Sequence, residues 1–129
     1  MQIGIPREIK DEEYRVGLPP FNAGELVRQG HEVFVETQAG AGIGFLDQHY
    51  QDVGVTVLLS SEEIFAVAAL IVKVKEPQAS EYALLRKNQI LFTYLHLAAD
   101  LPQTKALMES GCIAIAYETV TDKMGSLPL

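Results

Sequence analysis

Short apolar runs alternate along the chain with segments whose apolar residues have the spacing of a helix. The runs are rich in β-branched residues, and several are apolar on both faces, as in a parallel sheet that is covered by helices on both sides. Six runs qualify as strands: residues 2–5, 32–36, 55–58, 70–74, 90–95 and 112–116. This alternation predicts a doubly wound α/β fold with a mostly parallel sheet, either flavodoxin-like or Rossmann-like.

The segments between the runs carry signals for the start and the end of a helix. The predicted N-terminal capping pairs are Asn22 with Glu25 and Ser60 with Glu63. Gly30 and Gly111 stand where a left-handed C-terminal cap is expected. No linker or repeat divides the chain, so residues 1–129 are predicted to form one domain.

Charge and hydropathy exclude several classes of function. The formal net charge is −7, from 17 acidic and 10 basic residues, which disfavours nucleic acid and anionic membrane as partners. The longest apolar run, residues 65–72, is far shorter than the roughly 20 residues that span a bilayer. The first residues also lack the pattern of a secretory signal. We therefore expect a cytoplasmic protein, in which the single Cys112 is a small core residue.

A glycine-rich segment at residues 40–45 invites comparison with the dinucleotide fingerprint G-x-G-x-x-G. Its third glycine is missing, because position 45 is Phe, and Asp47 places an acid where a pyrophosphate would need a positive helix end. The segment is better interpreted as a turn. No phosphate-binding loop and no metal-ligand spacing occurs elsewhere.

Polar side chains gather where the predicted strands end. In an open α/β sheet, ligands bind at the carboxyl ends of the strands. Lys75, His96 and Glu118 follow three of the runs, and Arg15 lies in the loop after the first. These residues could supply a carboxylate clamp, a point charge and a proton carrier at one edge of the sheet.

Each of these residues also has a purely structural interpretation. Arg15 could pair with neighbouring acids on the surface, and Lys73 and Lys75 could both extend to solvent from one face of their strand. His96 could be a half-buried structural histidine, and Glu118 a solvated surface residue. Residue type and position alone leave these alternatives open.

Longer segments resemble the family of alanine dehydrogenases and pyridine nucleotide transhydrogenases, from residue 1 to residue 129. The segments that carry the resemblance are GIPRE (4–8), EYRV (13–16), GHEV (30–33), VKVKEP (72–77), QILFTYLHLAA (89–99) and IAYETV (115–120). Transhydrogenase sequences lack the second lysine of VKVKEP and the histidine of LHL. Both are present here, as Lys75 and His96, so the chain resembles the dehydrogenases more.

The resemblance implies an oxidoreductase that converts L-alanine to pyruvate and ammonia with NAD as hydride acceptor. By the same resemblance, Arg15 and Lys75 would bind the substrate, and His96 would act as general acid/base. Residues 1–129 would form the amino-terminal substrate-binding domain. The NAD-binding Rossmann domain would lie outside this chain, which would be inactive alone, and the whole enzyme would be a homo-oligomer.

Two departures from the family pattern lie outside the expected site: Pro19-Pro20 replaces a usual Thr-Pro, and Ala69 replaces a common acidic residue. Two alternative functions stay open at this point. One is a stand-alone module that binds 2-oxo acids without turnover. The other is the equivalent domain of a transhydrogenase-type nucleotide subunit.

Overall fold

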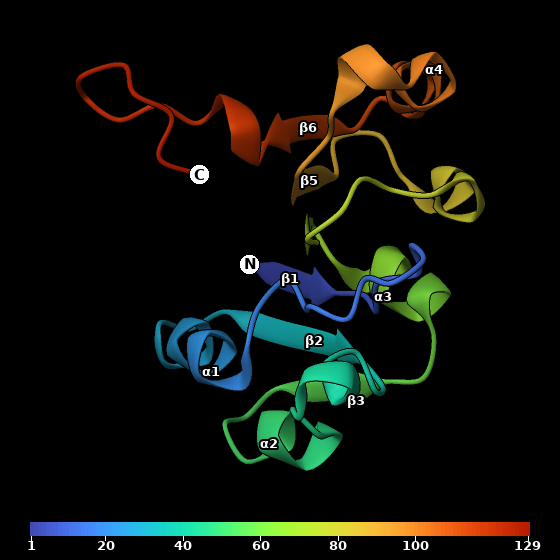
Figure 1. Ribbon diagram of the computed structural model, residues 1–129. Helices are drawn as coiled ribbons and strands as arrows, with labels where there is room; N and C mark the ends of the chain where they lie inside the picture. The colour runs from blue at the N-terminus through green and yellow to red at the C-terminus, as the bar shows by residue number, and fades with distance from the viewer.

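Six parallel strands form the centre of the molecule in the computed structural model, which describes all 129 residues (Figure 1). The strands are β1 (Gln2–Ile5), β2 (Glu32–Glu36), β3 (Thr56–Leu58), β4 (Leu70–Val72), β5 (Ile90–Thr93) and β6 (Ile113–Ala116). Their order in the sheet is β3-β2-β1-β4-β5-β6, and every neighbouring pair is parallel. The predicted α/β class is confirmed, and the order is that of a Rossmann sheet rather than a flavodoxin sheet.

All six predicted runs contain a strand, but the runs 70–74 and 90–95 extend beyond β4 and β5. The reason lies in the hydrogen bonds that follow each strand. After Val72 the backbone N–H of Val74 donates to the carboxylate of Glu8 (2.6 Å) instead of to a strand. The apolar character of these runs continues because the residues after the strand are still buried, as Val74 and Leu95 show.

Four α-helices connect the strands: α1 (Pro20–Arg28), α2 (Asp47–Gln51), α3 (Ser61–Val67) and α4 (Leu101–Ser110). Single turns of 3₁₀ helix cover Ala41–Ile43, Leu97–Ala99 and Tyr117–Thr119, and a longer one covers Ala79–Leu84. None of the helices is both long enough and apolar enough to cross a bilayer.

The helix ends agree with the sequence signals in three of four cases. Ser60 Oγ accepts the N–H of Glu63, and Gly30 (φ 90°) and Gly111 (φ 69°) both adopt the left-handed conformation. The Asn22 cap was wrong, because α1 already begins at Pro20. Proline is favoured in the first helical turn, where its missing N–H costs no hydrogen bond.

Two apolar clusters lie on opposite faces of the sheet. Side chains from α1 and α2 cover one face of β1, β2 and β3. On the other face α3 packs over β1 and β2, and its side chains share a cluster with those of α4, β4 and β5. Gly4 permits the close approach of α3, since a Cβ at this position would lie 2.7 Å from both Ala68 and Ile64. The edge strand β6 is less covered, and Ile113 and Ile115 remain 50% and 42% exposed.

The chain changes direction across the sheet between β1 and β4. β1 is followed by a strand on one side, β2, whereas β4 lies on its other side and continues to β5. The carboxyl ends of β1 and β4 therefore mark the point where the strand order reverses, which is where ligands bind in open α/β sheets.

Candidate functional site

The segment after β1 crosses the carboxyl edge of the sheet before it enters α1. Gly17 lies against the backbone of β4, and a Cβ at this position would be 2.5 Å from the carbonyl oxygen of Val72. Only glycine permits this approach without movement of the strand. The contact brings Arg15, two residues earlier, to the edge where β4 ends.

A buried charge cluster, consisting of Glu8, Lys73 and Glu81, lies directly beneath this edge. Lys73 is fully buried, and its Nζ lies 2.9 Å from Glu81 Oε1 and 3.4 Å from Glu8 Oε2. Burial raises the pKa of Glu8, although the charge of Lys73 and the N–H of Val74 oppose the rise. The interpretation that Lys73 extends to solvent was wrong, because two carboxylates bind its ammonium inside the protein.

Glu8 also fixes the backbone that carries Lys75. Its carboxylate accepts the N–H of Val74 at 2.6 Å and lies 3.4 Å from the N of Lys75. From the other side, Thr93 Oγ1 donates to the carbonyl oxygen of Lys75 (2.8 Å). The main chain of Lys75 is therefore held between the segments that follow β1 and β5.

The side chain of Lys75 is partly buried and takes part in no ion pair. The other lysines without an ion pair are exposed: Lys87, Lys105 and Lys123. Its positive charge contributes, after Arg15, to a lowered pKa of Glu13. Lys75 is thus a cation without a carboxylate partner, placed beside the Arg15–Glu13 pair.

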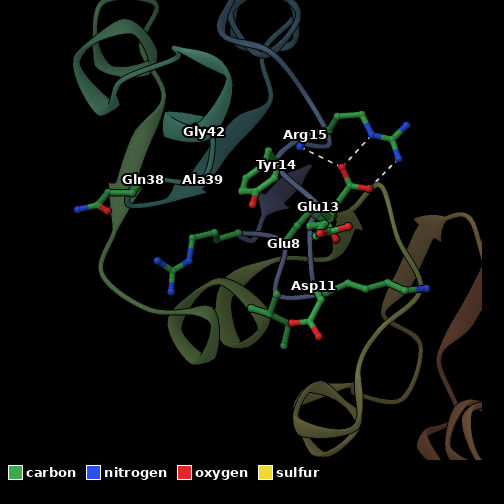
Figure 2. A pocket seen from close by; sticks show the side chains of 12 residues that line it. Glu8, Asp11, Glu13, Tyr14, Arg15, Gln38, Ala39 and Gly42 are labelled. Atoms are coloured by element: carbon green, nitrogen blue, oxygen red, sulfur yellow. Dashed lines mark hydrogen bonds and ion pairs between the residues drawn. The ribbon is translucent and has the colours of Figure 1, made fainter.

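Arg15 forms a two-pronged pair with Glu13, as Figure 2 shows. Its Nε lies 2.8 Å from Oε1 and its Nη2 lies 2.7 Å from Oε2. This pair first, and the neighbouring Tyr94 and Glu8 to a smaller extent, raise the pKa of Arg15, while burial opposes the rise. Glu13 occupies one edge of the guanidinium, which leaves Nη1 free for another anion.

His96 lies just beyond β5, with its backbone in the left-handed region at φ 50°. Glu118 holds this conformation because its carboxylate accepts the N–H of His96 (2.6 Å) and that of Leu95 (3.1 Å). The imidazole stacks on the ring of Tyr94, with centroids 5.9 Å apart and an interplanar angle of 16°. The side chain is 54% exposed, so it is more accessible than the half-buried histidine that the sequence suggested.

Glu118 therefore orients the backbone of His96 and is not simply a solvated surface residue. Burial raises the pKa of Glu118, but the N–H groups of His96 and Leu95 outweigh this effect and lower it overall. The carboxylate remains ionised, and it accepts from the backbone rather than from the imidazole.

The structure brings Arg15, Lys75 and His96 to one edge of the sheet without a direct contact between them. Arg15 lines a cavity of about 450 Å³ between the segments after β1 and β2, together with Tyr14 and Gln38. His96 lines a separate, more apolar cavity of about 430 Å³ between the segments after β5 and β6. Lys75 lines neither, so the three side chains share an edge and not a single cavity.

The glycine-rich segment does not fit a dinucleotide. A Cβ at Gly40 would meet Phe45 at 2.7 Å, so this glycine serves internal packing. At the start of the five-residue helix α2, the carboxylate of Asp47 accepts hydrogen bonds from the hydroxyl of Thr37 (2.6 Å) and from the backbone N–H of Gln38 (2.7 Å). The carboxylate of Asp47 thus lies at the N-terminus of α2, where the dinucleotide fingerprint would need a positive helix end. No group of three His, Cys, Asp or Glu side chains is placed to hold a metal ion.

Sequence reasoning missed the roles of Glu8 and Glu76. Glu76 follows Lys75 and binds Lys10 through one oxygen, while its other oxygen lies 3.7 Å from His96 Nδ1. A signal for the buried cluster was present, since Lys73 interrupts an apolar run between Val72 and Val74. A charge in such a place must be paired. Its partners, Glu8 and Glu81, come from the segment after β1 and from the 3₁₀ helix after β4, and the sequence alone did not identify them.

Comparison with known proteins identifies the family of the chain. The family model described as "Alanine dehydrogenase/PNT, N-terminal domain" matches residues 4–129. Alanine dehydrogenases from Halomonas elongata and Mycolicibacterium smegmatis are 50% and 47% identical to the whole chain. The chain covers 35% of each, so it spans about a third of the length of these relatives.

Two solved structures share the fold. One, an L-alanine dehydrogenase, is 52% identical, with a TM-score of 0.96 over 99% of this chain and 35% of its own. The other, a transhydrogenase from Sinorhizobium meliloti, is 24% identical with a TM-score of 0.88, over 96% of this chain and 35% of its own, and supports the fold only. The chain belongs to the alanine dehydrogenase/PNT family, and residues 4–129 constitute its N-terminal domain.

Proposed function

We propose that this chain is the substrate-binding domain of an NAD-dependent L-alanine dehydrogenase. In that reaction L-alanine, NAD and water give pyruvate, ammonium, NADH and a proton. The similarity of the whole chain to alanine dehydrogenases supports this function, as does the chemistry of the residues at the carboxyl edge of the sheet. In this proposal, Arg15 and Lys75 bind alanine or pyruvate, and His96 is the general acid/base.

The observation that carries the proposal is the partly buried, unpaired ammonium of Lys75. A buried charge without a counter-ion is unfavourable, and a small anion that enters the edge would supply one. The neighbouring acids are already occupied, Glu8 by Lys73 and Glu13 by Arg15. A cation that remains unpaired among so many carboxylates is therefore available for a ligand.

Arg15 would bind the carboxylate of that anion through the edge of its guanidinium that Glu13 leaves free. Arginine can bind two carboxylates at once because it has five N–H donors in one plane. Glu13 would then fix the direction of the guanidinium. Lys75 would interact with the carbonyl oxygen of pyruvate, where negative charge develops during the reaction.

His96 would exchange a proton with the hydroxyl of the carbinolamine. The carbinolamine breaks down with its nitrogen already protonated: the hydroxyl gives its proton to the imidazole, the carbonyl of pyruvate forms, and the electron pair of the broken C–N bond leaves with the nitrogen as ammonia. Histidine suits this step because its ordinary pKa of about 6.5 lies close to working pH. NAD supplies the hydride acceptor in the whole reaction, and no residue of this chain is assigned to hold it.

Calorimetry with pyruvate and the purified chain tests the binding step. Loss of a hydrogen bond to a charged group costs about 1.5–3 kcal/mol, so we expect Lys75→Met and Arg15→Ala each to weaken binding about 10- to 100-fold. Lys105→Met, on the exposed face of α4, is the control and should bind like the unchanged chain. Equal affinity of the Lys75 and Lys105 variants would refute the assignment of Lys75.

A measurement of alanine-dependent NADH formation separates an enzyme domain from a stand-alone binding module. The domain should support turnover only together with an NAD-binding domain, for example when fused to that of a relative. A module that binds pyruvate but supports no turnover in such a fusion would contradict the proposed function.

A further inference from the structure

One oxygen of Glu76 has no hydrogen-bond partner, although it is buried. Its Oε1 binds Nζ of Lys10, whereas its Oε2 makes no hydrogen bond. The side chain of Glu76 is only 13% exposed, and an unsatisfied buried carboxylate oxygen is costly. The nearest basic group is His96 Nδ1, at 3.7 Å from Oε2.

This carboxylate is charged at neutral pH. Burial raises the pKa of Glu76, but the hydrogen bond and charge of Lys10, together with the backbone N–H of Glu76 itself, outweigh burial, so the pKa lies below its ordinary value. The charge of His96 acts in the same direction. Oε2 can therefore only accept hydrogen bonds. It can accept one from a ring nitrogen that carries a proton, but it cannot bond to an unprotonated ring nitrogen.

Few other contacts orient the imidazole of His96. Glu118 holds its backbone N–H, and Gln103 Nε2 donates to the carbonyl oxygen of Leu95 (2.8 Å). Tyr94 stacks against one face of the ring. At 3.7 Å the Nδ1–Oε2 separation is longer than a hydrogen bond, so the side chain of His96 or Glu76 would have to move by less than about 1 Å to form one.

We propose that Glu76 is a positioning residue for His96, which accepts Nδ1–H and leaves Nε2 as the nitrogen that faces the substrate. This inference rests on the proposed function for its consequence but not for its geometry. When Nε2 takes the hydroxyl proton of the carbinolamine, the proton on Nδ1 stays where it is. The carboxylate of Glu76 then balances the positive charge of the imidazolium.

His49 provides an internal reference of opposite type. Its Nδ1 accepts the N–H of Leu46 at 3.1 Å, so this nitrogen is unprotonated in the neutral ring. The structure therefore assigns opposite tautomers to two histidines of the same chain: Nε2–H for His49 and Nδ1–H for His96. Both are visible in one nitrogen NMR spectrum.

The experiment is ¹⁵N NMR of the imidazoles in the purified chain, about two pH units above the ordinary histidine pKa of about 6.5. We expect the Nδ1–H tautomer of His96 to predominate by at least about tenfold, as a hydrogen bond to a charged acceptor allows. In Glu76→Gln the amide can donate to Nδ1, so the Nε2–H tautomer should predominate. In Glu76→Asp, which restores a carboxylate, the Nδ1–H tautomer should return at least in part.

Two controls separate this effect from a disturbed fold. Glu109→Gln changes an exposed glutamate of α4 and should leave His96 unchanged. The signals of His49 should be the same in every variant. A predominant Nε2–H tautomer of His96 in the unchanged chain, or a tautomer that does not respond to Glu76→Gln, would overturn the inference.

Pyruvate calorimetry on the same samples distinguishes failure of this inference from failure of the proposed function. An Nδ1–H tautomer that depends on Glu76, in a chain that does not bind pyruvate, would support the positioning role and contradict the substrate site. Pyruvate binding by a chain in which Glu76 has no effect on the tautomer would support the substrate site and contradict the positioning role.

Discussion

Two groups of charged side chains lie at the same edge of the sheet and differ in burial and in ion pairing. The buried cluster (Glu8, Lys73 and Glu81) is closed, because its lysine is fully enclosed and paired with both acids. The rim cluster (Arg15, Lys75 and His96) is open, since its lysine has no ion pair and its arginine and histidine are more than half exposed. Lys73 and Lys75 are only two residues apart, so residue type does not decide the difference.

The comparison shows how one segment supports both the fold and the site. Glu8 pairs with Lys73 below the edge, and it accepts backbone N–H groups of the residues that lead to Lys75. The buried cluster thus holds the backbone from which the rim cluster projects. We therefore expect substitutions in the first to change mainly stability, and substitutions in the second to change mainly binding.

The largest effect is expected for Lys73→Met. Removal of one partner leaves the carboxylates of Glu8 and Glu81 buried without a counter-ion, which costs about 3–5 kcal/mol of the free energy of unfolding. Lys75→Met is the matched control, with an expected loss below about 1 kcal/mol. Urea denaturation followed by circular dichroism measures both values. Similar losses for the two variants would remove the distinction between the clusters.

A smaller loss in the free energy of unfolding, about 1–3 kcal/mol, is expected for Gly17→Ala. Its new Cβ would lie 2.5 Å from the backbone oxygen of Val72, so the segment that carries Arg15 must move away from β4. Gly42→Ala is the comparison, because its Cβ would lie 3.1 Å from Cβ of Tyr14, a contact that a shift of a few tenths of an ångström relieves. Urea denaturation and pyruvate calorimetry should show larger losses of stability and affinity for Gly17→Ala than for Gly42→Ala.

Glu13→Gln tests whether the rim depends on its own ion pair. Exposed pairs contribute about 0–1 kcal/mol, so we expect pyruvate to bind up to about fivefold more weakly when the guanidinium of Arg15 is less well oriented. Stability should hardly change. Tighter binding of pyruvate by this variant would show instead that Glu13 competes with the ligand for Arg15.

The smallest effect concerns pH and has opposite signs for Glu8 of the buried cluster and for Glu118, which holds the backbone of His96. The pKa of Glu118 is lowered, so its contribution to stability is complete above about pH 4.5 and is lost as the pH falls through the lowered value. The pKa of Glu8 is raised, so its contribution declines as the pH rises from about 4.5 through the raised value. Solvent screens Glu118, which keeps its effect small.

Urea denaturation between about pH 5 and about pH 3 measures the effect of Glu118. The unchanged chain should lose more stability over this range than Glu118→Gln, which cannot titrate at this position. Carboxyl ¹³C titration should place Glu8 above the ordinary glutamate pKa and Glu118 below it. Two pKa values that both lie above the ordinary glutamate value, or both below it, would contradict this contrast.

Most of the fold was predictable because strands and helices depend on local patterns. The six apolar runs each contain a strand, and the signals at Ser60, Gly30 and Gly111 mark helix ends as expected. The ends of β4 and β5 were placed too late. There the backbone pairs with Glu8 and with the neighbouring segments, which no local pattern reveals.

The candidate site was predictable as a set of positions and not as a set of contacts. Strand-end positions and family resemblance identified Arg15, Lys75 and His96. The partners of these residues come from elsewhere: the acid that faces His96 follows β4, and the acid that holds its backbone follows β6. The separation of Arg15 and His96 into two cavities likewise appears only in three dimensions.

The sequence by itself determined the α/β class, the approximate positions of the strands and the family, because these follow from short-range periodicity and from long matching segments. Only the tertiary structure decided the order of the strands, the burial of Lys73 and the exposure of His96. These depend on which distant residues meet at the edge of the sheet. A charged side chain can be buried only where such residues compensate for the water that it loses.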